Sequence, residues 1–181
     1  MKLGAVLPLS IRGSYDVDDL GRTEILFKTL SAFAKPGTFG QFLIATPRDE
    51  VETVKQRCER WTQFSIHVIS EEELLPELKE HRHVRGWRKQ QMVKLGAARV
   101  LEEDYFLTLD ADVVCLKPIG LDNLFVNGRA IMQYEPRSLH PKWWQSSARL
   151  LNMSAHVGDA TIGMSVTPTI LDRKSTRLNS S

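Results

Sequence analysis

The sequence has few cysteines, no excess of one charge and no long apolar stretch. Its 181 residues include two cysteines, Cys58 and Cys115, which form neither a disulfide framework nor a spaced set of metal ligands. The 24 basic and 22 acidic residues leave a net charge of +2, without the basic stripe that nucleic-acid binding needs. No stretch approaches the roughly 20 apolar residues that span a bilayer. We therefore expect no nucleic-acid partner and no membrane span.

A secretory signal is also lacking at the N-terminus. Residues 1–13 hold a short apolar stretch that Pro8 interrupts, and they lack a small-residue cleavage site. Both cysteines are expected to be buried as small hydrophobes, Cys58 on an apolar helical face and Cys115 in a strand. These features predict a cytoplasmic protein.

The length and the hydrophobic content of 42% suit one globular domain. We expect this domain to cover residues 1–171. The last segment, 172–181, reads DRKSTRLNSS, is polar and aperiodic, and resembles a translated sequencing adapter. It is interpreted as a non-native tail, so that the natural chain is expected to continue past Leu171 and the domain to be incomplete at its C-terminus.

Apolar strands alternate with helices along most of the chain. The expected strands are Leu3–Leu9, Phe42–Ala45, Phe64–Ile69 and Tyr105–Leu109. The expected helices are one through Ile25–Phe33, one opened by Thr46-Pro47, a short one capped by Ser70–Glu73, and Trp87–Leu101. This alternation predicts an α/β fold with a mostly parallel sheet and helices on both faces. Weaker patterns predict strands at Leu124–Val126, Ala130–Tyr134 and Ile162–Val166, and a helix at Trp143–Leu151.

Two carboxylates directly follow the fourth expected strand. Asp110 and Asp112 flank Ala111 at the end of the apolar run 106–109. Ligands of open α/β sheets bind beyond the carboxyl ends of strands, and residues two apart in an extended chain share a side. Two neighbouring carboxylates repel unless a cation lies between them, and such hard oxygen ligands suit Mn²⁺ or Mg²⁺ bridging to substrate phosphates. The alternative is a solvated polar turn.

One face of the helix expected before this motif is polar near the start of the helix and apolar near its end. At 100° per residue, Trp87 and the polar residues Gln90, Gln91 and Lys94 share one face with the apolar residues Ala97, Ala98 and Leu101. This pattern predicts a helix whose first turns line a cavity, where Lys94 and the two amides bind a diphosphate or sugar hydroxyls. Arg88 adds positive charge nearby. The alternative is a solvated helix start with Trp87 as its anchor.

The segments GWRKQQMVKL (86–95) and YFLTLDADVVCLKP (105–118) resemble glycosyltransferases of the GT-A type. They are most similar to a poorly characterised bacterial family of expected glycosyltransferases, classed as a domain of unknown function. The segments WWQSSARLL (143–151) and GMSVTP (163–168) resemble the same family, and the similarity runs from Lys2 to Leu171.

The resemblance implies a Rossmann-like nucleotide-diphospho-sugar transferase fold and the transfer of a sugar from such a donor to an unknown glycan, lipid or protein acceptor. Pro8, Leu9 and Ser10 would then lie beside the nucleotide, and Gln90 and Gln91 nearer the sugar. Asp110 and Asp112 would hold the divalent cation, Mn²⁺ or Mg²⁺.

The catalytic step requires stabilisation of the departing diphosphate and, in an inverting enzyme, a base for the acceptor hydroxyl. The cation supplies the first, with help from Lys94 or Arg88. Candidate bases are Glu135, His156 and Asp159, each of which could equally be a surface residue. Trp143 and Trp144 are candidates for an acceptor platform, or for core packing.

Three other functions remain open. The string LTLDADVV also fits haloacid-dehalogenase-like phosphatases, with Asp110 as the nucleophile and Asp112 as the general acid, although those enzymes place the motif on their first strand. A sugar-nucleotide nucleotidyltransferase shares the fold but needs a glycine-rich loop after the first strand, where only Gly13 is present. A catalytically incomplete nucleotide-sugar-binding fragment is the third.

Overall fold

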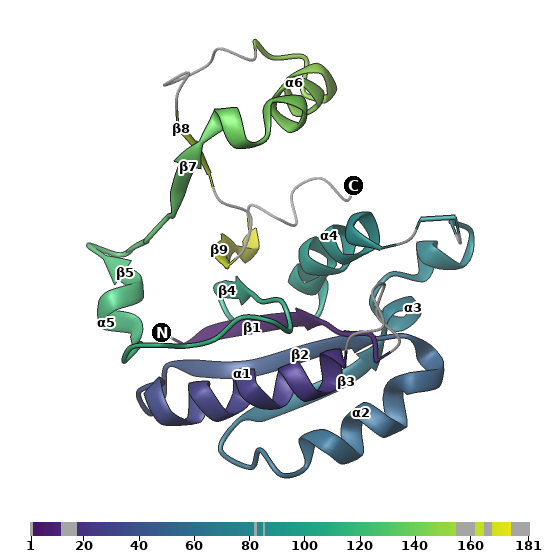
Figure 1. The fold of residues 1–181 in the computed structure, drawn as a ribbon, viewed down its shortest axis with the longest axis vertical. Coiled ribbons are helices and arrows are strands. Elements are labelled where there is room, and N and C mark those ends of the chain that lie inside the picture. The colour runs from purple at the N-terminus through teal and green to yellow at the C-terminus, as the bar shows by residue number, and fades with distance from the viewer. Residues whose placement is uncertain are drawn as a thin grey trace.

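The computed structural model describes residues 2–11, 18–81, 83–84, 86–154, 162–164 and 168–174, the residues 162–164 by their backbone alone. Its centre is a five-stranded sheet of order β3-β2-β1-β4-β9 with helices on both faces (Figure 1). The strands are β1 (Leu3–Pro8), β2 (Phe39–Thr46), β3 (Ser65–Ser70), β4 (Tyr105–Thr108) and β9 (Thr169–Asp172). The first four run parallel to their neighbours, and β9 is antiparallel to β4. The predicted fold class is therefore confirmed.

Helices α1 (Asp19–Phe33) and α2 (Val51–Cys58), the latter preceded by the 3₁₀ turn η1 (Arg48–Glu50), cover one face of the sheet. Phe27 of α1 and Phe42 of β2 are almost fully buried there. The Phe27 ring also contacts Trp61 and Phe64, at centroid distances of 5.7 and 5.5 Å. This aromatic cluster joins α1 to the segment between α2 and β3, because burial of large rings is strongly favourable.

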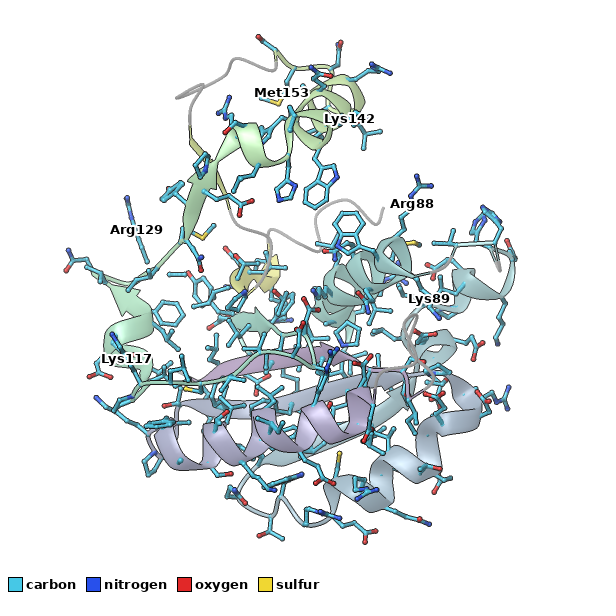
Figure 2. All side chains as sticks on the ribbon, viewed as in Figure 1. Arg88, Lys89, Lys117, Arg129, Lys142 and Met153 are labelled. Carbon is cyan, nitrogen blue, oxygen red and sulfur yellow. The ribbon has the colours of Figure 1, made fainter. Side chains whose placement is uncertain are left out.

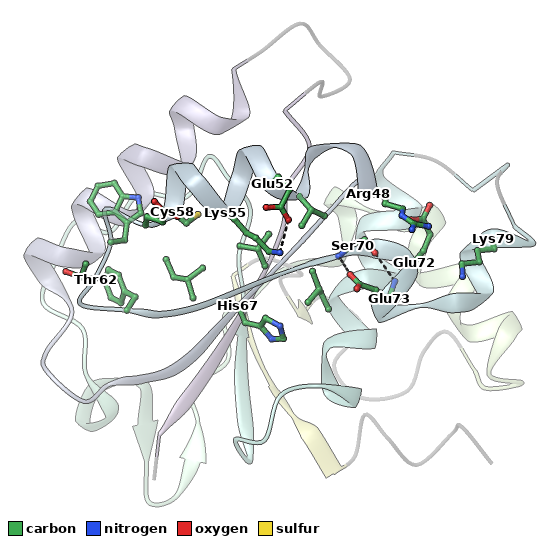
Figure 3. Close-up of a pocket in the computed structure, with 17 residues that line it drawn as sticks. Arg48, Glu52, Lys55, Cys58, Thr62, His67, Ser70, Glu72, Glu73 and Lys79 are labelled. Atoms are coloured by element: carbon green, nitrogen blue, oxygen red, sulfur yellow. Dashed lines mark hydrogen bonds and ion pairs between the residues drawn. The ribbon is translucent and has the colours of Figure 1, made fainter.

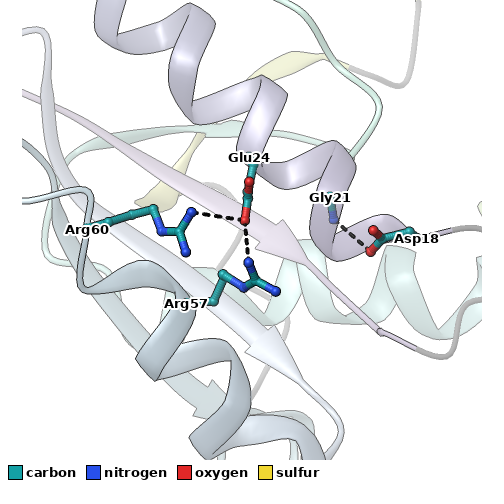
Figure 4. Close-up of polar contacts among 5 residues, drawn as sticks. All are labelled: Asp18, Gly21, Glu24, Arg57 and Arg60. Atoms are coloured by element: carbon teal, nitrogen blue, oxygen red, sulfur yellow. Dashed lines mark hydrogen bonds and ion pairs between the residues drawn. The ribbon is translucent and has the colours of Figure 1, made fainter.

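Polar contacts fix the ends and the outer side of this layer. The Asp18 carboxylate accepts a hydrogen bond from the Gly21 N–H at 2.8 Å and caps α1, and Glu24 contacts Arg57 and Arg60 at 2.9 and 3.2 Å (Figure 4). A cap contributes about 1 kcal/mol. Exposed ion pairs contribute only about 0.2–1 kcal/mol each, so the cap and the apolar core dominate the stability of the layer.

The opposite face is covered by α3 (Glu71–Leu74), η2 (Pro76–Lys79), α4 (Trp87–Gly96) and η3 (Ala97–Arg99). Leu74, Val93 and Ala97 from these helices pack against Val6 and Leu43 of the sheet. Since α4 connects β3 to β4, the chain changes both the face and the direction of winding at this point. The sheet order then places β4 on the other side of β1 from β2.

The remaining described elements include two small antiparallel sheets of two strands each. Beyond the short helix α5 (Leu121–Leu124) lie β5 (Phe125–Val126) and β6 (Arg129–Ala130), followed by β7 (Tyr134–Pro136), η4 (Arg137–Leu139), α6 (Pro141–Leu150) and β8 (Ile162–Met164). Strand β7 pairs with β8. We call residues 134–154 the α6 arm, which stands away from the sheet layers (Figure 1). No residue of η4 or α6 is buried.

The local predictions succeeded best where the pattern was long. The four main strands and the Ser70–Glu73 capping box are present. The expected helix Trp87–Leu101 is too long, because α4 ends at Gly96 and a 3₁₀ turn follows. The expected strand Ala130–Tyr134 is also wrong, since its two ends belong to different two-stranded sheets.

Both cysteines are buried, as expected, but Cys115 is not in a strand. Its backbone N–H instead donates to the Thr29 hydroxyl at 3.1 Å, which ties the loop after β4 to α1. Strand β9 was not predicted. Its last residue, Asp172, belongs to the stretch that was interpreted as a tail. The backbone N–H of the following residue, Arg173, donates to the Asp104 carbonyl at 2.9 Å. Among the helices of the described ranges, none has the length and apolar character to cross a membrane.

Candidate active site at the carboxyl ends of β1 and β4

Strands β1 and β4 flank the switch point of the sheet. The chain winds from β1 outward through β2 to β3 and then crosses back to β4 on the other side of β1. In the β1–β4 pair, Val6 lies opposite Thr108, and the Leu109 N–H donates to the Val6 carbonyl at 2.9 Å. Continued by two residues, this register brings Pro8 level with Asp110. Ligands of open α/β sheets bind in the crevice at such a point, so both predicted segments lie where a ligand is expected.

The chain turns at the Asp110-Ala111-Asp112 motif. The strand ends at Thr108, and the Val113 N–H donates to the Asp110 carbonyl at 3.2 Å, which closes a turn. The extended conformation that was assumed to put both carboxylates on one side is therefore absent. Ala111 packs against the core on the α1 side. Asp110 is half-buried and Asp112 is exposed, so the two carboxylates differ in their surroundings.

Lys94 of α4 contacts this turn directly. Its ammonium Nζ lies 2.7 Å from Asp110 Oδ1, and the Lys94 side chain is only 3% exposed. The Asp110 side chain is 34% exposed. Lys94 was predicted to face an anionic ligand, and the anion that it meets in the structure is the carboxylate of the motif. A buried ammonium requires such a partner, because an uncompensated charge in the protein interior is strongly unfavourable.

The first turns of α4 are more open than expected. Trp87, Arg88 and Gln90 are exposed, whereas Gln91 is half-buried. The apolar continuation of this face is buried, since Ala97 and Leu101 are 0% exposed. The face is therefore polar and accessible at its start and buried at its end, as the pattern indicated. Whether the open part binds a ligand stays a prediction.

The end of β1 offers its backbone rather than its side chains. Pro8 and Leu9 are buried, and Ser10 is half-buried. The Ile11 N–H donates to Glu50 Oε2 at 2.7 Å. The loop after β1 is thus attached to the loop after β2. Glu50 is only 6% exposed. No local pattern indicated this role, because a glutamate three residues after Pro47 is ordinary in the first turn of a helix.

A second buried carboxylate that the sequence did not reveal follows β3. Glu71 is 8% exposed, and its Oε2 lies 2.6 Å from the ammonium of Lys89 on α4. Burial raises the pKa of the Glu71 carboxyl, and the contact with Lys89 opposes this effect without cancelling it. The carboxyl ends of β2 and β3 therefore carry Glu50 and Glu71, whose charges also repel each other weakly.

The α6 arm carries the predicted acceptor residues. Trp143 stacks on Trp87 of α4 at a centroid distance of 4.9 Å, and the Arg137 guanidinium lies 4.2 Å over the Trp144 ring. Glu135, a candidate base, lies on β7, and its Oε1 is 3.8 Å from Nε2 of His140. The other two candidate bases, His156 and Asp159, lie outside the described residues.

The donor set at the motif fits a hard divalent cation of the Mn²⁺ or Mg²⁺ kind. Within the described ranges, no three side chains of His, Cys, Asp and Glu gather into a ready-made metal site. Mg²⁺ typically uses one or two protein carboxylates and completes its shell with waters and substrate phosphates. The half-buried Asp110 and the exposed Asp112 can supply those carboxylates, so such an ion would depend on a phosphate ligand to complete its coordination.

A hollow of about 990 Å³ lies along the free edge of β3 (Figure 3), and its lining includes no residue of the Asp110–Asp112 turn. Its lining includes Trp61 and Phe64 and charges of both signs, among them Lys55, Glu52 and Glu73. Glu52 pairs with Lys55 at 2.9 Å, and Glu73 caps α3. The hollow therefore offers no concentration of positive charge to a diphosphate. The switch point between β1 and β4 remains the better candidate.

Solved glycosyltransferase structures share the fold. The apo form of mouse xyloside xylosyltransferase 1 superposes with a TM-score of 0.59 at 10% identity, over 99% of this chain and 70% of that one. Glucosyl-3-phosphoglycerate synthase from Mycobacterium tuberculosis, in complex with Mn²⁺, uridine diphosphate and glucosyl-3-phosphoglycerate, superposes with a TM-score of 0.51 at 14% identity. That match covers 96% of this chain and 57% of the synthase.

These structures are similar to the chain in fold, and the nucleotide-sugar transferase architecture expected from the sequence is confirmed. Strand β4 is the fourth strand along the chain and a central one in the sheet, which does not match the first-strand position of the phosphatase motif. No curated protein sequence is significantly similar to this chain. A sequence profile does match residues 1–180, and the chain belongs to the Family of unknown function (DUF6492).

Proposed function

We propose that the chain carries the donor site of a glycosyltransferase, which moves a sugar from a nucleotide-diphospho-sugar to an acceptor hydroxyl. The observation that carries this proposal is the position of the Asp110–Asp112 turn, at the carboxyl end of β4 and beside the switch point of the sheet. The shared fold adds support, since a structural neighbour was solved with Mn²⁺ and uridine diphosphate.

The residues around the turn would bind different parts of the sugar donor. Asp110 and Asp112 would hold a divalent cation, which supplies positive charge to the departing diphosphate. Lys94 fixes the Asp110 carboxylate through the 2.7 Å contact. The backbone after β1, from Pro8 to Ser10, would lie beside the nucleotide. Gln90 and Gln91 on α4 would contact the sugar, and Arg88 would add positive charge near the diphosphate.

A thermal-stability screen tests this assignment. Diphospho-sugars of uridine, guanosine, adenosine and thymidine would be added with and without Mn²⁺. A ligand at about 100 times its Kd adds about 2.7 kcal/mol of stability, which raises the Tm of a chain of this size by roughly 5–10 °C. We expect one nucleotide to produce this shift, and only with Mn²⁺.

Two variants make the screen specific. Asp112→Asn removes a charge from an exposed position and should abolish the Mn²⁺-dependent shift without lowering the Tm of the free protein. Asp104→Asn is the matched control, since Asp104 is exposed and lies just before the opposite end of β4. Unchanged nucleotide affinity in Asp112→Asn, or an equal loss in Asp104→Asn, would refute the metal assignment.

A further inference from the structure

Three aromatic rings from two separate parts of the chain form a column beside the candidate donor site. Trp87 is the first residue of α4, Trp143 lies on α6, and His140 directly precedes α6. The Trp143 ring lies 4.9 Å from that of Trp87 and 3.9 Å from that of His140, at interplanar angles of 24° and 6°. This aromatic column connects the α6 arm to α4.

The aromatic column is not a closed core. Trp87 is 50% exposed and Trp143 is 41% exposed, and no residue of α6 is buried. Large rings left half in water forgo much of the stabilisation that full burial would give. An arm built only to pack would be expected to bury these rings, whereas a ligand-binding surface keeps them accessible until the ligand covers them.

The helix α4 links the aromatic column to the turn. Trp87, Gln91 and Lys94 are spaced i, i+4 and i+7, so they lie on one face of α4. Seven residues of helix rise about 10 Å, and Lys94 contacts Asp110. The aromatic column therefore lies roughly two helical turns from the carboxylate that would hold the cation, with an amide between them.

Polar groups border the aromatic column on the arm side. Glu135 Oε1 lies 3.8 Å from His140 Nε2, and the side chains of Glu135 and His140 are 25% and 37% exposed. Figure 2 shows Arg88 on the side of α4 that faces α6, where Lys142 lies. Apolar ring surfaces bordered by acceptors and donors match a sugar ring, which has apolar C–H faces and a rim of hydroxyls. A purely apolar chain would leave the polar groups without partners.

Trp144 is in a different position. The Arg137 guanidinium lies 4.2 Å over its ring, and Trp144 is more buried than Trp143. The cation covers that ring face, whereas the rings that cover Trp143 belong to the aromatic column itself, whose outer ring Trp87 is 50% exposed. Of the two tryptophans that the sequence suggested, Trp143 is therefore the one with an aromatic partner on α4.

The geometry points to a carbohydrate acceptor site on the exposed surface of the aromatic column, where the half-exposed Trp87 ring stacks on the sugar, Trp143 and His140 support that ring, and Glu135 binds hydroxyls at the edge. The role of this carbohydrate as the sugar acceptor rests on the proposed function, whereas the binding of a carbohydrate to these residues does not. The site joins the start of α4 to the arm, and the acceptor would thus be held on the same helix that contacts the metal-binding turn.

Ligand-observed NMR with three oligosaccharides, cellotetraose, maltotetraose and chitotetraose, tests the site on the full chain without nucleotide or metal. We expect saturation transfer to at least one of them. Trp143→Ala and Trp87→Ala should weaken that binding about tenfold, the effect of losing roughly 1.4 kcal/mol of ring contact. Trp143→Phe keeps a ring and should retain part of the affinity. Trp144→Phe is the matched control on the same helix and should bind as the parent does.

A reciprocal pair of variants separates this site from the donor site. Asp112→Asn should lose the Mn²⁺-dependent nucleotide shift and keep carbohydrate binding, and Trp143→Ala should do the reverse. If none of the three oligosaccharides binds, or if both Trp143 variants bind as the parent does while circular dichroism shows them folded, the acceptor site is wrong. If carbohydrate binds and no nucleotide does, the proposed donor site fails and the carbohydrate site stands.

Discussion

The contact between Lys94 and Asp110 predicts that the two aspartates of the turn will differ in their effect on stability. Asp110→Ala removes the carboxylate that lies 2.7 Å from an ammonium that is 3% exposed. Removal of one partner from a buried ion pair is destabilising by about 3–5 kcal/mol. Because the Asp110 side chain is 34% exposed, solvent screens part of this effect. We therefore expect a loss of about 2 kcal/mol.

Asp112→Ala should behave differently, because Asp112 is exposed. Substitutions at such positions change stability by about 0.5 kcal/mol or less. In thermal unfolding, Asp110→Ala should lower the Tm by roughly 4–8 °C, whereas Asp112→Ala should leave it within about 2 °C of the parent. Both variants should lose the Mn²⁺-dependent nucleotide shift. Asp110→Ala should therefore lose both stability and binding, whereas Asp112→Ala should lose binding alone.

A double variant identifies the cause. Lys94→Met in the Asp110→Ala background removes the buried charge that has lost its carboxylate, and an apolar side chain of similar length fills its place. We expect it to recover at least half of the lost stability, since replacing both members of a buried pair by apolar groups is often neutral. The reasoning fails if Asp110→Ala unfolds with the same Tm as the parent, or if Lys94→Met lowers the Tm further.

Three other predictions follow from local structure. Ser70→Ala removes the side-chain acceptor for the Glu73 N–H and should reduce the free energy of unfolding by about 1 kcal/mol in urea titrations. Gly86 has φ 58° and ψ −137°, so Gly86→Ala should destabilise the start of α4 by about 1–3 kcal/mol, measurable as a lower Tm. Burial raises the pKa of the Cys58 thiol from 9.0 to about 11. The unfolded chain therefore loses its thiol proton first, and the free energy of unfolding should fall as the pH rises through this window, less so in Cys58→Ala.

The sequence predicted the sheet well because its strands are strongly apolar. The strand from Leu3 to Pro8 is buried at every position, so its residues do not alternate between polar and apolar as in a half-buried strand. The sequence also predicted that Asp110 and Asp112 would follow the fourth strand, from the local pattern alone. It could not show that Asp110 would meet Lys94, because the two lie on different elements and only the packing of α4 against β1 brings the helix to the turn.

The buried carboxylates show the same limit. Glu50 and Glu71 look like the acidic first turns of helices, and Glu71 does begin α3. Glu71 is buried where α4 brings the Lys89 ammonium to 2.6 Å, and Glu50 where the chain after β1 brings the Ile11 N–H to 2.7 Å. His140 was missed because its ring stacks on Trp143, which in turn contacts Trp87 of α4, and a contact between such distant segments leaves no local pattern. Contacts between distant segments, rather than local patterns, determine the candidate site.

The contact between Lys94 and Asp110 also makes cation and diphosphate binding interdependent. In the free chain the Lys94 ammonium offsets the negative charge of Asp110 and so weakens the attraction of this carboxylate for a cation. A cation arriving alone must share Asp110 with Lys94, whereas one arriving with a diphosphate gives that ammonium a second anion to contact. Binding of the two should thus be cooperative, and by linkage each must raise the affinity for the other by the same factor. Mn²⁺ alone should then shift the Tm little, and Mn²⁺ with a nucleoside diphosphate should shift it by more than the two separate shifts combined. Additive shifts in calorimetry or thermal unfolding would mean that Lys94 does not couple the two ligands.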